Sequence, residues 1–447
     1  MASRGETVFF EAPSDLLSVS ATTRARTLAK LESFGVHALR IVLYWRDVAP
    51  SPRHRRRPSF NQADPAAYHW GAYDQLIKRA AALHWTVLLT VSGPVPRWAT
   101  PHGEDQYSDP SASAFGLFMR AVGKHYGTRV KLFAIWNEPN QPGYLRPQYA
   151  HGQLASAAIY RRLFLAGYRG LQASGNFSGM HVLMGETSPV GVRSRRIPAP
   201  LAFLRGVLSL DSAYRPLGHC ATLPADGYAQ HPYSESQGSF WIPPTDDVTI
   251  GTIGRLVTAL DRAAAVGAIE PRMPVYITEF GVQSYPNRVQ GLPLRQQAEF
   301  DAMAERIAWS NPRIASFAQY LLRDDHPVDG YVVGFQSGLE TYNGQRKPVY
   351  QGFRLPLVVT RTRTGVSFWG LARPARAATR VVLQYSSNGG RSWRGLAGEH
   401  TEPSGAWTAV GRFVARRMWR VGWVSAGGQT VFGAPTRAYT SSGRIDY

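Results

Sequence analysis

The chain has 447 residues, of which 44% are hydrophobic and 18% are charged, a composition typical of a folded globular protein and unlike a disordered or collagen-like chain. Fifty Lys and Arg against 30 Asp and Glu give a net charge of +20, which leaves an anionic partner open. No zinc finger, RNA-recognition signature or basic heptad region indicates sequence-specific nucleic-acid binding. The single cysteine, Cys220, excludes an intrachain disulfide and a cysteine-based zinc site.

Membrane, metal and cofactor partners find no support in the sequence. No run of about 18 apolar residues is present, so we expect no membrane span. The first ten residues lack the basic and apolar regions of a signal peptide. We expect a secreted protein whose signal has been removed, and a cytoplasmic location remains the alternative. The histidines show no H-E-x-x-H or paired spacing, so we expect no metal site and no cofactor.

Residues 1–353 alternate short apolar runs with longer segments of helical periodicity. The runs are apolar on nearly every residue, as strands buried on both faces of a parallel sheet should be. Those at 8–10 and 227–230 are the weakest. The predicted strands are 8–10, 38–44, 86–92, 130–135, 181–185, 227–230, 275–278 and 314–321.

The segments between these strands carry apolar residues at helical spacing. The predicted helices are 28–34, 73–83, 112–126, 153–173, 253–264 and 294–310. Gly35 and Gly267 follow two of them as helix stops. Eight strands alternating with helices predict a (β/α)8 TIM barrel, an α/β fold, over residues 1–353. A doubly wound sheet is the alternative, but the glycine-rich phosphate loop that usually opens it is absent.

Residues 354–447 have a different texture, with short alternating strands separated by Gly, Pro and Asn-Gly. The strands expected at 366–368, 380–384, 407–409 and 420–424 predict a small all-β sandwich of the immunoglobulin or fibronectin kind. The pattern S-x-N-x-G-x-S-W from Ser386 resembles the Asp-box hairpin of sialidase-like propellers. A single copy cannot build a propeller, so we interpret it as a hairpin turn.

Two predicted barrel strands run directly into an acidic residue. Strand 130–135 is followed by W-N-E-P-N, which contains Glu138, and strand 275–278 is followed by E-F-G, which begins with Glu279. The carboxyl ends of the strands of a parallel barrel meet at one mouth, so both side chains should lie there. A carboxylate after a buried strand costs several kcal/mol unless it faces a polar cavity. A salt-bridged or capping role is the alternative for either Glu alone.

The motifs I-W-N-E-P-N and I-T-E-F-G together resemble the acid/base and nucleophile signatures of clan A retaining glycoside hydrolases, family 39 more than family 5. The resemblance covers the predicted barrel. It implies cleavage of β-glycosidic bonds by double displacement, with Glu138 as acid/base and Glu279 as nucleophile. Arg40 on the second strand matches the clan's arginine that pairs with the nucleophile. His231 and Tyr233, in H-P-Y, match the pair that lines the sugar subsite.

Three tryptophans near strand ends are candidate substrate-binding residues. Trp45, Trp98 and Trp136 each follow a predicted strand and offer a face on which a pyranose ring could stack. Taken singly, a tryptophan at such a position is more often part of the core. The stacking role therefore stands as a hypothesis for all three.

Further candidates lie at other strand ends. The resemblance implies that Asn137 donates a hydrogen bond to the sugar 2-hydroxyl. On the eighth strand, where much of the clan carries a tryptophan platform, this sequence offers Gln319 and Tyr320 as substrate-binding residues instead. Glu186 ends the fifth strand and is either a cavity residue or the partner of a neighbouring arginine.

The loop after the second strand carries the densest positive charge, R-H-R-R-R at Arg53–Arg57, and should rim the mouth. It could clamp an anionic polysaccharide, and a solvated loop is the alternative. The sequence as a whole predicts a retaining glycosidase whose partner is a carbohydrate, with its anionic character open. The rival hypothesis is a barrel that binds glycan or an anionic polymer without catalysis.

Overall fold

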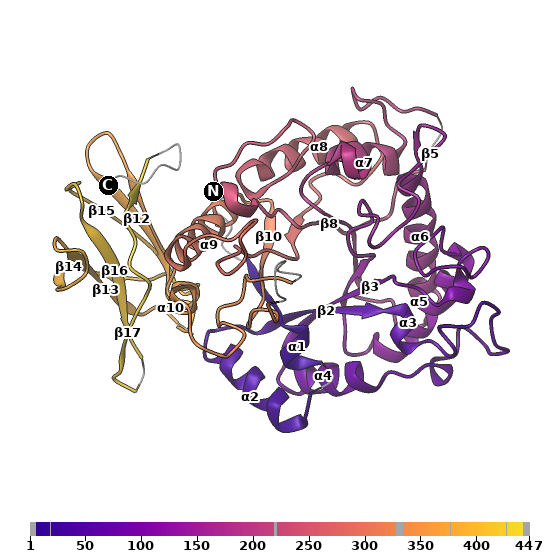
Figure 1. The fold of residues 1–447 in the computed structure, drawn as a ribbon, viewed down its shortest axis with the longest axis horizontal. Coiled ribbons are helices and arrows are strands. Elements are labelled where there is room, and N and C mark those ends of the chain that lie inside the picture. Colours follow the sequence, from indigo (N-terminus) through magenta and orange to yellow (C-terminus); the bar gives the residue numbers. More distant parts are fainter. Residues whose placement is uncertain are drawn as a thin grey trace.

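The computed structural model describes residues 6–17, 19–218, 221–327, 334–375, 377–425 and 427–440. A barrel surrounded by helices forms the larger part, and two four-stranded sheets, whose pairs are antiparallel except for one, lie at one end of the molecule beside α9 (Leu294–Trp309) and α10 (Pro348–Arg354) (Figure 1). The only cysteine, Cys220, lies outside the described residues. None of the helices in the described part of the chain is long and apolar enough to cross a bilayer.

The barrel is closed and all its neighbouring strands are parallel, which confirms the predicted TIM barrel. Both weak predictions, the first and sixth strands, form. In chain order the strands are β1 (Thr7–Glu11), β2 (Ala38–Tyr44), β3 (Thr86–Ser92), β4 (Leu132–Ile135), β7 (His181–Thr187), β8 (Gly227–Gln230), β9 (Val275–Ile277) and β10 (Ile314–Tyr320).

The helices cover the outside of the barrel. They include α2 (Ala21–Glu32), α4 (Gly71–Ala82), α5 (Ala112–Tyr126), α6 (Ala155–Gln172), α7 (Pro200–Leu208), α8 (Ile253–Ala265), α9 and α10, with the short α1 (Pro13–Leu16) and α3 (Trp45–Val48). The six predicted helices all form. The helix α7 was not among those predicted, although its buried residues recur at helical spacing: Pro200, Leu201, Phe203, Leu204, Val207 and Leu208.

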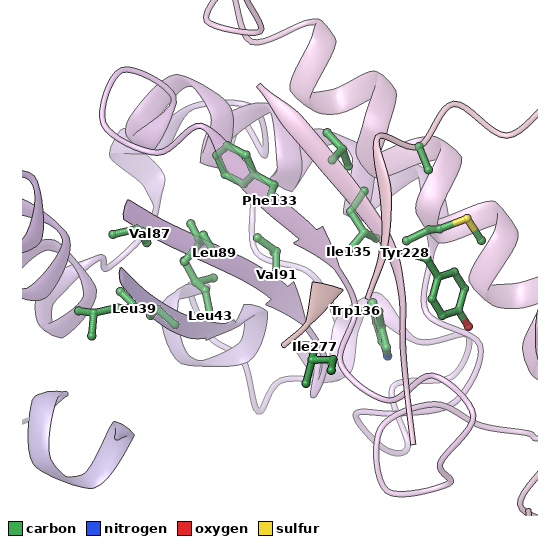
Figure 2. Close-up of a cluster of buried hydrophobic side chains, with 14 of the residues drawn as sticks. Leu39, Leu43, Val87, Leu89, Val91, Phe133, Ile135, Trp136, Tyr228 and Ile277 are labelled. Carbon is green, nitrogen blue, oxygen red and sulfur yellow. The ribbon is translucent and has the colours of Figure 1, made fainter. Parts of the chain in front are cut away.

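Side chains along each barrel strand alternate between the helix layer and the barrel interior. Figure 2 shows part of the core, including Leu39, Val87, Leu89 and Ile135. The interior layer consists of Phe9, Ala38, Leu88, Ala134, Leu183, Ala229 and Ala318. Two positions beyond three of these residues stand Glu11, Arg40 and His231, so the next layer toward the carboxyl ends of the strands is polar and charged.

The C-terminal sheets each have four strands, in the orders β15-β12-β11-β18 and β14-β13-β16-β17, and agree with the predicted sandwich. Their bounds are β11 (Leu357–Arg361), β12 (Val366–Leu371), β13 (Arg380–Ser386), β14 (Arg394–His400), β15 (Ala406–Gly411), β16 (Met418–Val424), β17 (Thr430–Phe432) and β18 (Ala438–Tyr439). The Asp-box-like segment is the turn between β13 and β14, where Asn388 Oδ1 accepts from the Ser392 N–H at 3.0 Å.

The two parts share a packed contact. Met303 of α9 lies in one apolar cluster with Val358 and Trp369 of the first sheet. Arg373, just after β12, donates to both carboxylate oxygens of Glu305 at 2.5 and 2.7 Å. The sandwich is therefore fastened to the helix layer of the barrel.

Candidate active site

Glu138 and Glu279 face one another at the carboxyl ends of β4 and β9. His231, which follows β8, joins them: its Nδ1 is hydrogen-bonded to Glu138 Oε1 at 3.1 Å and lies 3.6 Å from Glu279 Oε2. Because both contacts share one atom, the two oxygens are no further apart than the sum of these distances, about 6.7 Å. The side chains keep 17% and 12% exposure, so both carboxylates remain reachable.

The backbone presents Glu138 from a sharp turn. Its φ is +40°, in the left-handed region that residues other than glycine seldom adopt, and its N–H donates to the Glu186 carbonyl at 3.0 Å. Such conformations concentrate at functional sites, where the surrounding structure must hold them. The bond to the neighbouring strand end supplies part of that restraint here.

Arg40 is the hub of the site. Its guanidinium is fully buried, and Nη1 donates to Glu279 Oε2 at 2.8 Å and also to Glu11 Oε2. Nη2 donates to Glu186 Oε2 at 2.8 Å and to Asn137 Oδ1 at 2.5 Å. Arg40 therefore orients the nucleophile candidate Glu279 and two further carboxylates. It also orients Asn137, the residue that precedes the acid candidate in the sequence.

The nucleophile candidate is held as an anion. The Tyr233 hydroxyl donates to Glu279 Oε1 at 2.6 Å, while Arg40 covers the other oxygen. Burial raises the pKa of Glu279, but the positive charges of His231 and Arg40 and the bond from Tyr233 outweigh it, so the pKa lies below its ordinary value.

The acid candidate is shifted the other way. Burial is the main cause that raises the pKa of Glu138 above its ordinary value, and the negative charge of Glu279 adds to it, against the bond to His231. His231 itself has a raised pKa: burial lowers it, but the charge of Glu279 and the bond to Glu138 prevail. Two carboxyl groups whose pKa values are pushed apart are suited to different roles, one as acid and one as anion.

The stacking hypotheses for Trp45 and Trp136 are wrong. Trp45 is fully buried and stacks on Phe118 with ring centroids 5.1 Å apart, and Trp136 is fully buried with its edge against Phe115 (Figure 2 shows Trp136 in the core). Trp98 packs edge-on against Trp45 at 5.6 Å and is 9% exposed. All three rings belong to one aromatic cluster. Trp45 and Trp136 offer no free face to a sugar, whereas Trp98 lines surface pockets beside Ser111, so its stacking role stays a prediction.

The eighth strand gives one correction. Gln319 is buried and its Nε2 donates to the Ser337 carbonyl at 3.1 Å, so the side chain serves the loop that follows the strand. Tyr320 is the next residue and therefore points the opposite way. Tyr320 shares a cavity with Glu11 and Arg40 at the mouth. The candidate role of Tyr320 thus stands, while that of Gln319 is wrong.

Two more carboxylates complete the site. Glu186 is the partner of an arginine, the second of its two sequence-based interpretations: Arg40 and the Thr90 hydroxyl, at 2.9 Å, occupy its oxygens. Glu11 was not among the predicted residues. Its signal was present but weak, because it stands two positions after the interior residue Phe9, at the end of the least convincing strand.

The arginine-rich loop lies on the protein surface. Arg53–Arg57 are all exposed and follow β2 on the mouth side of the barrel. No group of three or more potential metal ligands occurs in the described residues.

Comparison with solved structures identifies the fold. A family 39 glycoside hydrolase from Bacteroides cellulosilyticus WH2 matches with a TM-score of 0.54 and 14% identity, over 93% of this chain and 81% of its own. A glucosidase from Croceicoccus marinus matches with 0.54 and 11%, over 94% and 95%. A monomeric β-xylosidase from Caulobacter crescentus CB15 matches with 0.52 and 14%, over 94% and 96%. No family model and no curated protein matches the chain. The chain thus has the fold of family 39 glycoside hydrolases, as the sequence motifs suggested.

Proposed function

We propose that this protein is a retaining glycoside hydrolase that cleaves β-glycosidic bonds in an oligosaccharide or polysaccharide. The observation that carries the proposal is the His231 nitrogen that contacts both carboxylates and so places one oxygen of each within about 6.7 Å of the other. Retaining enzymes hold these groups about 5–5.5 Å apart, whereas inverting enzymes need about 6.5–9.5 Å to admit a water. Two oxygens at most about 6.7 Å apart are compatible with the retaining arrangement.

In the first step Glu279 acts as nucleophile. Its carboxylate attacks the anomeric carbon, the bond from that carbon to the leaving oxygen breaks, and the proton of Glu138 passes to the leaving oxygen. The opposed pKa shifts support these roles, because at the start Glu138 must carry a proton and Glu279 must not.

In the second step Glu138 changes from a proton donor to a proton acceptor. A water attacks the anomeric carbon, its proton passes to Glu138, and the ester bond to Glu279 breaks to regenerate the carboxylate. While Glu279 is esterified its negative charge is absent, so one cause of the raised pKa of Glu138 disappears. Glu138 then becomes the base that this step requires.

Asn137 and Arg40 prepare the sugar subsite. The Asn137 Oδ1 is engaged by Arg40, which leaves the amide nitrogen as the donor that turns toward an acceptor. A hydrogen bond from that nitrogen to the sugar 2-hydroxyl would strengthen in an oxocarbenium-like transition state. The Arg40 bond thus fixes the orientation that the proposed role of Asn137 needs.

The proposal is tested by hydrolysis of a panel of aryl β-glycosides and β-linked polysaccharides, with the configuration of the first-formed product followed by NMR. We expect the β-anomer to appear first and to mutarotate later. The α-anomer as first product would refute the retaining mechanism, and absence of hydrolysis across the panel would refute the enzymatic function.

A second candidate function is binding of an anionic polymer without catalysis, which the exposed Arg53–Arg57 loop favours. Electrostatic binding of this kind weakens steeply with salt. Salt-sensitive retention on an anionic polysaccharide column that is equal in the parent and in Glu279→Gln, together with no hydrolysis, would support this candidate instead.

A further inference from the structure

The carboxylates that share Arg40 differ in how open they are. Glu186 is closed, with a side chain only 1% exposed and both oxygens occupied by Arg40 and Thr90. Glu11 keeps 8% exposure and Glu279 keeps 12%. Two of the three arginine partners are therefore reachable from the mouth, and only one of those two, Glu279, has a role in the proposed reaction.

Glu11 lies directly beside the proposed nucleophile. Its Oε2 and the Oε2 of Glu279 accept from the same nitrogen, Arg40 Nη1. The other oxygen, Glu11 Oε1, accepts no hydrogen bond within the described part of the chain. Glu11 borders a cavity of about 120 Å³ whose wall also includes Arg40, Tyr44 and Tyr320. Glu11 thus combines a position beside the proposed nucleophile with a partly exposed acceptor at the barrel mouth.

The chemistry of this acceptor restricts what can bind there. Burial raises the pKa of Glu11 to about 7, although the charge of Arg40 opposes the rise, so the protein alone solvates this carboxylate poorly. A sugar hydroxyl supplies the missing donor. A sugar carboxylate brings only acceptors, and it would meet the like charges of Glu11 and Glu279.

We propose that Glu11 is a substrate-recognition residue: it accepts a hydrogen bond from a hydroxyl of the sugar bound over Glu279 and so selects a neutral sugar over a uronic acid at this subsite. The inference rests on the proposed glycosidase function and deepens it. The charge at the site would then differ from that of the whole protein: the net charge is +20, but the groups around the sugar would be the carboxylates Glu11, Glu138 and Glu279. The arginine-rich loop would then contact, at most, more distant parts of a substrate.

The test compares Glu11→Gln with the parent on three kinds of substrate. These are the neutral aryl glycoside hydrolysed fastest, the uronide with the same hydroxyl configuration, and monodeoxy analogues of the neutral sugar. We expect the parent to favour the neutral sugar in kcat/KM by at least about tenfold, and the variant to lose most of that preference. At one deoxy position the parent should lose about tenfold or more while Glu11→Gln loses almost nothing, since the partner is already gone.

Glu186→Gln is the matched control, because it removes an Arg40 partner that does not open on the cavity. We expect it to lower kcat/KM by the same factor on every substrate. Glu11→Asp, which keeps the charge but withdraws the carboxylate, serves if Glu11→Gln does not fold, and it should also weaken the deoxy coupling. A parent that prefers the uronide, or a Glu11 variant that retains both the preference and the deoxy loss, would overturn the inference. If the parent cleaves no glycoside or polysaccharide, the proposed function fails first.

Discussion

Arg40 at the mouth of the barrel and Arg373 at the seam with the sandwich are both buried beside carboxylates, yet their surroundings differ. One nitrogen of Arg373, Nη2, donates to both carboxylate oxygens of Glu305, and each of these side chains is only 4% exposed. Arg40 donates hydrogen bonds to three carboxylates, and two of them, Glu11 and Glu279, remain partly exposed at the mouth. The Arg373–Glu305 ion pair is buried and joins two parts of the fold, whereas several reachable carboxylates around one arginine are an arrangement suited to catalysis.

The carboxylates around Arg40 form the open cluster and those around Arg373 form the closed cluster. The largest expected difference between the two clusters concerns turnover. Glu279→Gln removes the proposed nucleophile, so kcat should fall on the order of 10⁴-fold or more. The fold should persist, because the Gln oxygen can still accept from Arg40 while its amide nitrogen can donate to the Tyr233 hydroxyl oxygen. Steady-state kinetics and circular dichroism of the purified variant measure both quantities.

Glu305→Gln is the counterpart at the seam. It weakens a closed buried ion pair, so the free energy of unfolding should fall, by up to about 3–5 kcal/mol, while kcat of the folded protein stays within about twofold. A large loss of kcat in Glu305→Gln would contradict the structural role given to the closed cluster. A modest loss of kcat in Glu279→Gln would contradict the catalytic role given to the open cluster.

The acid/base role can be isolated next. Glu138→Ala should lower kcat by about 10²–10⁴-fold on substrates with poor leaving groups and much less on activated aryl glycosides, which need no proton. Added azide should restore turnover and yield a glycosyl azide of retained configuration, because the small anion enters the space left by the carboxylate. Equal losses on all leaving groups without azide rescue would contradict the assignment.

The closed cluster makes its own contribution to the pH dependence of stability. Asp301 is buried near Glu305, and burial raises its pKa to about 7, with Oδ1 unpartnered. Its folded pKa exceeds its unfolded value, so its contribution to stability is fully present below the unfolded pKa and is lost as pH rises through 7. Asp301→Asn should match the parent near pH 4 and exceed its unfolding free energy by about 2–4 kcal/mol at pH 8. Denaturant unfolding at both pH values measures this; an equal advantage at both would contradict it.

The smallest expected effect lies in the pH profile of the open cluster. His231 lowers the pKa of both Glu138 and Glu279, so His231→Asn should move both limbs of the kcat/KM profile to higher pH. The acidic limb reports the nucleophile losing its proton and the basic limb reports the acid losing its own. Movement of only one limb would show that His231 serves only one of the two carboxylates.

The sequence was most informative where a strand pattern and a chemical motif coincided. Glu138 and Glu279 each follow a buried apolar run that forms a barrel strand. Because the carboxyl ends of all the strands of a parallel barrel lie at one mouth, the meeting of the two carboxylates there could be predicted. The helices with one apolar face could be predicted for the same reason. The helix α7 was missed although its buried residues also recur at helical spacing, because its short apolar sequence has only one charged residue, Arg205.

The errors concern which way a side chain points. Trp45 and Trp136 follow barrel strands as the carboxylates do, but turns rotate them toward the helix layer; Trp136 has a φ of +74°. Gln319 precedes an inward-facing residue and therefore faces outward. A pattern of residue types does not record such local rotations, and Glu11 escaped notice because its strand was too short to establish a phase.

The most direct test of the central claim, that two opposed carboxylates perform double displacement, is to trap the intermediate. Incubation with activated 2-deoxy-2-fluoro β-glycosides, followed by proteolysis and mass spectrometry, locates the attached sugar. We expect one equivalent of glycosyl group, bound as an ester to Glu279 and absent from Glu279→Gln. A label on Glu11 or Glu138, or turnover with inversion and no covalent adduct, would contradict it.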